Sequence, residues 1–168
     1  MTRPEQYPFI SFEFDTRSLT SGMWLDMGEA MSKCQHLAGV PLKPARAAEM
    51  GAVYLARGVQ ATTAIEGNTL TEDEVKQIVA EGTAHVGKSR EYQEREVQNV
   101  LGAIRDIDHA LRSGERLPIS RERLERLNFE ILDGIPDEPH VVPGKLRTYN
   151  VHAGRYLAPQ WQDVPDLV

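Results

Sequence analysis

Few residues of this chain could do chemistry, and the histidines are the first to consider. None stands at a recognised metal-ligand spacing from another histidine, a cysteine or a carboxylate. Lone histidines usually pack or form hydrogen bonds, so we interpret these as structural or solvated. The pattern therefore predicts no metal site and no catalytic residue in the chain. The histidines are His36, His85, His109, His140 and His152.

Carboxylate pairs are more frequent, and we expect most of them to form solvated helix faces. The pairs are Glu72 with Asp73, Glu94 with Glu96, and Asp106 with Asp108. Thr62 and Glu66 form a different pattern, because residues four apart near the end of a helix share one face of it. This pattern also has a purely structural interpretation, in which Glu66 is merely exposed and Gly67 is the C-cap of the helix.

The elements that must position these residues are mainly helical. We predict a helix from about Pro44 to Ile65, since proline suits a first helical turn. Thr71 and Glu74 form a capping box, so a second helix begins there, and Gly82 ends it. Two further helices are predicted over 88–112 and from Ser120 to about residue 132, where apolar residues recur.

The two ends of the chain have a different character. Two short β-prone runs flank Ala153 and Gly154, which indicates a hairpin. Residues 8–15 alternate with a period of two and predict a short extended piece. A helix capped by Asp15 or Thr16 should follow and end at Gly39. Cys34 lies in its apolar spacing and is expected to be buried, and residues 163–168 resemble the start of a further helix.

Length and composition agree with an ordinary globular protein. The 168 residues favour one domain, and 40% apolar with 26% charged residues is typical of soluble proteins. The net charge is −6, and no basic block stands out, so we expect no nucleic-acid partner. We find no secretory signal and no run of about 18 apolar residues, so we expect no membrane span. One cysteine fits a cytoplasmic location.

The stretch from Thr62 to Val75, TTAIEGNTLTEDEV, resembles the Fic family of AMP-transferases. The inhibitory signature of that family is Ser or Thr, three residues, Glu, then Gly or Asn, and Thr62, Glu66 and Gly67 fill it in order. Residues 96–104 resemble the helix that opens the Fic core, and 119–132 resemble its next helix. Residues 144–151 resemble the segment that leads into the family's β-hairpin flap. The resemblance covers most of the chain after residue 40.

The resemblance implies a mainly α fold: a Fic-like helical bundle with a short β-hairpin flap, its core incomplete at the C-terminal end. Residues 1–85 would be an N-terminal helical region with the inhibitory helix at about 44–66. Residues 86–168 would be the first part of the Fic core, with the flap at about 144–158. The family often has a histidine in the helix where this chain has Leu127 and Asn128.

The catalytic loop of the family reads His-x-Phe-x-Asp-Gly-Asn-Gly-Arg-x-x-Arg and does not occur in the sequence. By the resemblance it would follow Val168, and we expect the 168-residue chain alone to be inactive. The intact protein would transfer AMP from ATP to a protein hydroxyl, with Mg²⁺ bridging the phosphates. In the family the inhibitory glutamate pairs with the last arginine of that loop, which otherwise holds the γ-phosphate of ATP. Glu66 would therefore be a regulatory residue beside the nucleotide, and Thr62 would hold the helix by hydrogen bonding.

The resemblance also assigns a role to the hairpin. Val151 would lie near the nucleotide, and Tyr149, Asn150, Val151 and His152 would dock a target protein by strand addition. The alternative is a plain edge hairpin that Gly154 and Arg155 protect from pairing.

Two other functions stay open. The chain could be a non-enzymatic regulator that supplies an inhibitory helix in trans to a Fic enzyme, or a helical binding module whose motif is accidental. The sequence identifies neither the target protein nor the transferred nucleotide, and it leaves a homodimer open.

Overall fold

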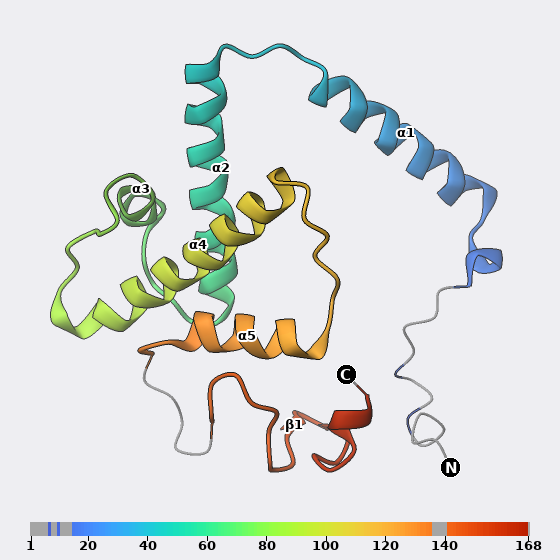
Figure 1. Cartoon of the computed structure of the whole chain (residues 1–168), viewed down its shortest axis with the longest axis vertical. Coiled ribbons are helices and arrows are strands. Elements are labelled where there is room, and N and C mark those ends of the chain that lie inside the picture. The colour runs from blue at the N-terminus through green and yellow to red at the C-terminus, as the bar shows by residue number, and fades with distance from the viewer. Residues whose placement is uncertain (1–6, 8–9, 11–14, 136–140, 168) are drawn as a thin grey trace. The chain divides into compact units, whose positions relative to one another are not determined.

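The computed structural model describes residues 7, 10, 15–135 and 141–167, and most of these residues are helical (Figure 1). This confirms the mainly α fold expected from the sequence. The α-helices in this part of the chain are α1 (Ser21–Ala38), α2 (Pro44–Ile65), α3 (Glu72–Glu81), α4 (Glu91–Arg112) and α5 (Arg121–Leu132). Short 3₁₀ helices occupy Thr16–Ser18, Lys88–Arg90 and Val164–Asp166, and the strands are β1 (His152–Ala153) and β2 (Tyr156–Leu157).

The chain divides into two compact units between Ala48 and Glu49, inside α2. The first unit contains α1, whose N-cap is Thr20 rather than Asp15; Asp15 instead caps the 3₁₀ helix Thr16–Ser18. No residue of α1 is buried, and the predicted burial of Cys34 is wrong because its side chain is exposed. The extended piece predicted for residues 8–15 lies largely outside the described residues.

The second unit has a small apolar core built from α2, α3, α4 and the loop that leads into α3. α3 begins with the predicted capping box: Thr71 Oγ1 accepts from the Glu74 N–H, and Glu74 Oε2 accepts from the Thr71 N–H. It ends at Gly82, whose φ of +84° is the left-handed conformation of a helix C-cap. The core residues are Ala56, Val59, Leu70, Val75, Ile78, Val97 and Leu101.

α4 is the central helix of this unit and packs against both α3 and α5 (Figure 1). Asn99 on α4 ties down the end of α5, because its Nδ2 donates to the carbonyls of Ile131 at 2.9 Å and Asp133 at 2.8 Å. Ser120 is the N-cap of α5, as predicted, since its hydroxyl accepts from the Arg123 N–H.

Gly144 brings the segment before the hairpin close to α5. Its N–H donates to Asn128 Oδ1 at 2.8 Å. A Cβ at this position would lie 2.9 Å from Phe129 Cβ and 3.2 Å from the Glu125 carbonyl oxygen, and the φ of +73° is also strained for other residues. Only glycine therefore fits this close approach without a rearrangement.

None of the helices in the described part of the chain has both the length and the apolar character needed to cross a membrane.

Candidate functional site

The end of α2 carries the Thr62–Glu66–Gly67 pattern on a Schellman turn. The Asn68 N–H donates to the Thr63 carbonyl and the Gly67 N–H to the Ala64 carbonyl, both at 3.1 Å. Gly67 has a φ of +95°, which supplies the left-handed residue that this motif needs. Glu66 is therefore the C-cap residue, and the turn fixes the backbone from which its side chain projects.

The two polar side chains of the pattern behave differently. The Thr62 hydroxyl donates to the Gly58 carbonyl at 2.9 Å, a bond within its own helix. Glu66 is exposed, and its carboxylate forms no hydrogen bond or ion pair with any residue that the structure describes. Its negative charge is therefore available to a cation from elsewhere.

Asn68 holds the turn against α4 through the hydrogen bonds of its side chain. Its side chain is only 7% exposed. Its Nδ2 donates to the Gln93 carbonyl and to Glu96 Oε2, both at 2.9 Å, and its Oδ1 accepts from the Leu70 N–H at 2.9 Å. One buried amide thus links the end of α2, the start of the α3 loop and the first turns of α4.

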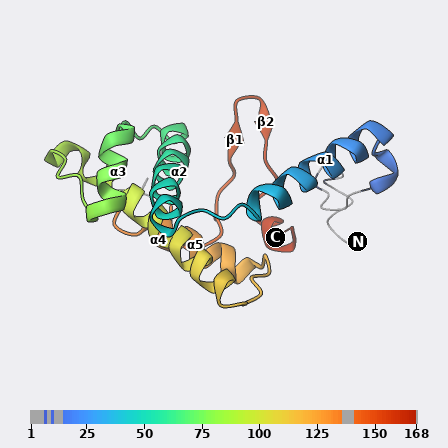
Figure 2. The ribbon, with the colours of Figure 1, turned by 90° about the horizontal axis from the view of Figure 1, so that it is seen from above.

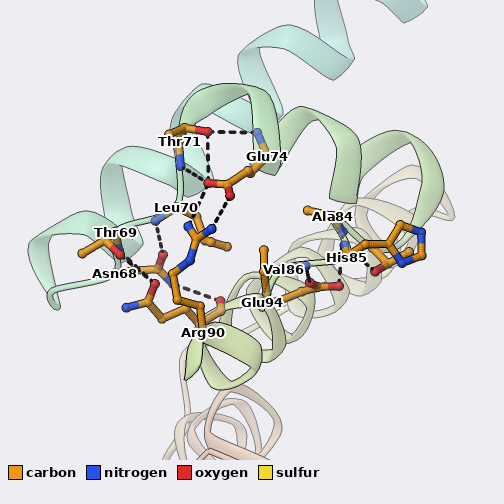
Figure 3. A network of polar contacts seen from close by, with 12 residues as sticks. Asn68, Thr69, Leu70, Thr71, Glu74, Ala84, His85, Val86, Arg90 and Glu94 are labelled. Carbon is orange, nitrogen blue, oxygen red and sulfur yellow. Dashed lines mark hydrogen bonds and ion pairs between the residues drawn. The ribbon is translucent and has the colours of Figure 1, made fainter. Parts of the chain in front are cut away.

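Two further contacts reinforce the same junction (Figure 3). Gln93 Oε1 accepts from the Thr69 hydroxyl at 2.9 Å and from its N–H at 3.3 Å. The Arg90 guanidinium bonds both carboxylate oxygens of Glu74, at 2.7 and 3.2 Å. This bidentate pair, together with the Thr71 N–H, lowers the pKa of Glu74 to about 2.

Glu94 forms a second buried polar centre, under the loop after α3. Its carboxylate accepts from the N–H groups of Ala84 at 3.2 Å and Val86 at 3.3 Å, and His85 between them takes a φ of +50° (Figure 3). Burial acts to raise the pKa of Glu94, but hydrogen bonds from Thr83, Val86 and Ala84 outweigh it, and the net shift is downward. This carboxylate anchors the loop and is not available for chemistry.

Sequence reasoning missed Asn68, Gln93 and Glu94 as a group. Glu94 is an exception to the expectation that most of the carboxylate pairs are solvated, because it is only 8% exposed. A signal existed: Glu94 stands three residues before Val97, on the apolar face of α4, where a solvated carboxylate would not be placed.

The hairpin is a two-residue turn between two short antiparallel strands (Figure 2). His152 lies opposite Leu157, and Ala153 lies opposite Tyr156. The Ala158 N–H donates to the Val151 carbonyl at 3.2 Å, so these two form a hydrogen-bonded pair. Because such pairs alternate with non-bonded ones, the N–H and C=O groups of His152 and Leu157 point to the outer edges of the hairpin.

The two edges are not equivalent. On the β2 side the next outward position after Leu157 is Pro159, which has no N–H. Its carbonyl is also taken, because Arg147 Nη2 donates to it at 2.7 Å while Nη1 donates to the Tyr149 carbonyl at 2.9 Å. In the described chain β1 pairs only with β2, and His152 is exposed. The edge of β1 is therefore the one that can accept another strand.

A cavity of about 510 Å³ lies between α5 and the segment that leads into β1. Its lining mixes apolar side chains with polar and charged ones, and its carboxylate, Glu125, pairs with Arg121 at 3.0 Å. The charged and polar residues of the lining are Arg121, Glu125, Asn128, Lys145, Arg147, Thr148 and Tyr149.

The structure thus places the predicted residues in two groups within residues 49–168. Thr62, Glu66 and Gly67 lie at the end of α2, and Tyr149, Asn150, Val151 and His152 lie on or just before β1. No hydrogen bond or ion pair among the described residues joins the two groups. Nor do any three His, Cys, Asp or Glu side chains of the residues that the structure describes gather as metal ligands.

Comparison with known proteins gives no match: no family model, no curated protein and no solved structure matches this chain.

Proposed function

We propose that this chain supplies the inhibitory helix and the target-docking hairpin of a Fic-type adenylyltransferase, which transfers AMP from ATP to a hydroxyl of another protein. The observation that carries the proposal is the Glu66 carboxylate. It is exposed and unpaired among the described residues, and the Schellman turn and the buried Asn68 amide hold its backbone. It stands in the residue pattern that resembles the family's inhibitory signature.

The proposed action of Glu66 is to capture an arginine that would otherwise bind ATP. A carboxylate and a guanidinium form a charge-assisted and often bidentate pair. An arginine held in this way no longer grips the γ-phosphate, so ATP binds in an unproductive pose. Because a misplacement of about 1 Å can slow a reaction on the order of 100-fold, one ion pair suffices to silence the enzyme.

The catalytic parts come from the resemblance alone. A loop of the pattern His-x-Phe-x-Asp-Gly-Asn-Gly-Arg-x-x-Arg would provide the histidine that acts as base and the arginine that Glu66 captures. Mg²⁺ would bind with the phosphates of ATP. We assign no metal ligand and no catalytic residue to the 168-residue chain itself.

The hairpin would hold the target protein. The free edge of β1 offers the N–H and C=O of His152 to an extended segment of the target, which would add as a third strand. Asn150 is held in place because its Oδ1 accepts from the Trp161 N–H at 3.1 Å. In this proposal Tyr149, Asn150 and His152 line the docked segment, and Val151 lies toward the nucleotide.

A second candidate is a regulator that acts in trans. The same observation supports it, because the Glu66 carboxylate is open to a cation on another polypeptide as well as on its own. In that case the chain would inhibit a separate Fic enzyme and would perform no transfer itself.

The substitution Glu66→Gly separates the candidates. We would read the gene beyond the codon for Val168 and measure AMP transfer by its complete product with labelled ATP. An inhibitory helix in cis predicts that Glu66→Gly raises transfer. A regulator predicts no transfer by the product, and weaker inhibition of an added Fic enzyme after the substitution. If neither activity responds to Glu66→Gly, the motif is accidental.

A matched control is available at the end of α3. Glu81 is also an exposed glutamate directly before a glycine of positive φ, Gly82. Glu81→Gly makes the same chemical change before another glycine of positive φ, although the turn there has a single Gly82-to-Ile78 bond and Glu81 accepts from Gln77 Nε2 at 3.2 Å. Because Glu81 lies outside the inhibitory pattern, its substitution should leave transfer and inhibition unchanged.

A further inference from the structure

Helix α1 carries apolar and small side chains at a regular spacing. Met23, Met27, Ala30, Cys34 and Leu37 follow one another at alternating intervals of four and three residues. This is the seven-residue repeat of helices that pair with another helix, because it keeps the side chains in one narrow line. We call these five residues the α1 seam. In the usual lettering of the repeat, Met27 and Cys34 are at position a, and the other three are at position d.

The α1 seam is exposed throughout. No residue of the helix from Ser21 to Ala38 is buried in the structure. Trp24 and Met31 stand beside the seam at position e and widen it with two further large apolar side chains, which are 50% and 62% exposed. A contiguous apolar surface of this kind marks a site of interaction.

The charges beside the seam select the partner. Position g holds Asp26 and Lys33, and position e holds no charged residue. Asp26 forms no hydrogen bond or ion pair with the described residues, whereas Lys33 pairs with Glu29 of its own helix. The three donors of the Lys33 ammonium allow a second carboxylate to bind as well.

These charges complement an antiparallel copy of the same helix. In a parallel pair of helices position g faces position e, so Asp26 would face Met31 of the second copy. In an antiparallel pair g faces g, so Asp26 meets Lys33 of the second copy, and twofold symmetry repeats this ion pair on the other side.

The residues of the seam fit the same arrangement. When Met27 lies opposite Ala30 of the second copy, Met23 lies opposite Cys34, so a large side chain meets a smaller one in each of these layers. The overlap extends from Thr20 to residue 37 and so includes nearly the whole helix. A parallel pair would instead set Ala30 against Ala30 and leave space between the helices.

We propose that α1 pairs in antiparallel orientation with α1 of a second copy, so that the protein is a homodimer with twofold symmetry. Met27 and Ala30 lie on either side of the symmetry axis, and the ion pairs of Asp26 with Lys33 border the seam. The inference goes beyond the proposed adenylyltransferase function and does not depend on it, because neither Glu66 nor the hairpin takes part.

Sedimentation equilibrium of the 168-residue chain from about 1 µM to 1 mM tests the dimer and should show reversible association. Met27→Gln should weaken association at least about tenfold, because it places an amide in the seam twice. Leu25→Gln is the matched control: Leu25 is 73% exposed but lies at position f, away from the seam, so the dissociation constant should not change. A chain that stays monomeric throughout this range overturns the inference and leaves the seam to another part of the chain or to a different protein. An equal effect of the two substitutions also overturns it.

Exchange of charges tests the pairing of Asp26 with Lys33. Asp26→Lys should weaken association about 5- to 30-fold, because two attractive pairs become two repulsive ones, and Lys33→Asp should do the same. The double variant carries both charges exchanged and should recover most of the affinity, which a misfolded chain cannot do. A double variant that associates no better than the single ones contradicts the antiparallel arrangement.

A disulfide tests the orientation directly. Met23→Cys places a new thiol opposite Cys34 of the second copy, and oxidised glutathione should join the two chains there. Within one helix these positions are about 16 Å apart along the axis, so they cannot bond to each other. Trypsin cleaves after Lys33, so mass spectrometry of the peptides distinguishes a bond between positions 23 and 34 from a bond between like positions. Bonds between like positions overturn the antiparallel orientation, and so does cross-linking of Leu25→Cys as fast as that of Met23→Cys.

Discussion

Asn68 gives the sharpest test of how this structure holds its candidate site. The substitution Asn68→Ala removes three hydrogen bonds of a side chain that is 7% exposed. The partners left behind include the N–H of Leu70, a core residue that is 2% exposed, and the Gln93 carbonyl, whose residue is 5% exposed. The unpaired state of these partners matters more than the loss of the amide itself, because water reaches buried groups poorly and cannot replace the missing hydrogen bonds.

The size of the effect follows from those partners. A buried donor or acceptor left unpaired costs about 1–3 kcal/mol. Glu96 is only half-buried and can turn to water, and the Gln93 carbonyl keeps its bond from the Val97 N–H within α4. We therefore count the Leu70 N–H as the group left unpaired and expect Asn68→Ala to lower the free energy of unfolding by about 1–3 kcal/mol. Asn68→Asp should be at least as harmful near neutral pH, since it places a second carboxylate beside Glu96.

Urea unfolding of the 168-residue chain, followed by far-UV circular dichroism, measures this free energy. Glu66→Gln is the control in the same turn, and it should change stability by less than about 0.5 kcal/mol because Glu66 has no partner among the described residues. Acidification should partly relieve Asn68→Asp as the carboxylates protonate. An Asn68→Ala loss no larger than that of Glu66→Gln would refute the idea that Asn68 holds the turn.

Three other predictions concern glycines and the ion pair. Gly67→Ala should cost about 1–2 kcal/mol in unfolding free energy, because only its φ of +95° is unfavourable and nothing lies within 4 Å of a new Cβ. Gly144→Ala should cost more, about 2–4 kcal/mol, since strain adds to the close contact with Phe129, and equal costs in thermal or urea unfolding would contradict this. The pKa of Glu74 is lower in the folded chain, about 2 against 4.5. The contribution of the Glu74 carboxylate to the free energy of unfolding is therefore complete above pH 4.5 and is lost as pH falls toward 2. Arg90→Gln should lower the free energy of unfolding at neutral pH by about 1–2 kcal/mol, a value reduced to allow for the solvent exposure of the pair. It should also weaken the fall of the unfolding free energy between pH 4.5 and 2. An unchanged dependence on pH in this range would show that the ion pair contributes nothing.

Local signals in the sequence predicted most of the helix boundaries. The capping box at Thr71, the cap at Ser120 and the stop at Gly82 are each determined by residues within one turn, so a short window of sequence contains the information. The hairpin turn at Gly154 follows in the same way from two β-prone runs around it.

The polar network beneath Glu66 could not be predicted in this way. The burial of Asn68 depends on Gln93 and Glu96, which are 25 and 28 residues away in the sequence. Helical spacing places Glu94 on a face of α4 but does not show that a loop will cover that face. Cys34 shows the opposite error, since its apolar spacing predicted a buried side chain, yet α1 buries none of its residues.

The inequality of the two hairpin edges also needed the structure. Sequence patterns indicate a hairpin but not its register, and a shift of one residue would exchange the inward and outward backbone groups. The bond from Ala158 to Val151 fixes that register. It leaves His152 facing outward on one edge and Pro159 blocking the other.

The central claim is that Glu66 silences AMP transfer, and the most direct measurement is the initial rate of transfer from labelled ATP by the complete gene product. We predict that Glu66→Gly raises this rate at least about tenfold, since freeing one catalytic arginine restores the productive pose. Glu81→Gly should leave it at the level of the unmodified protein. Equal rates for all three proteins, or no transfer by any of them, would contradict the account.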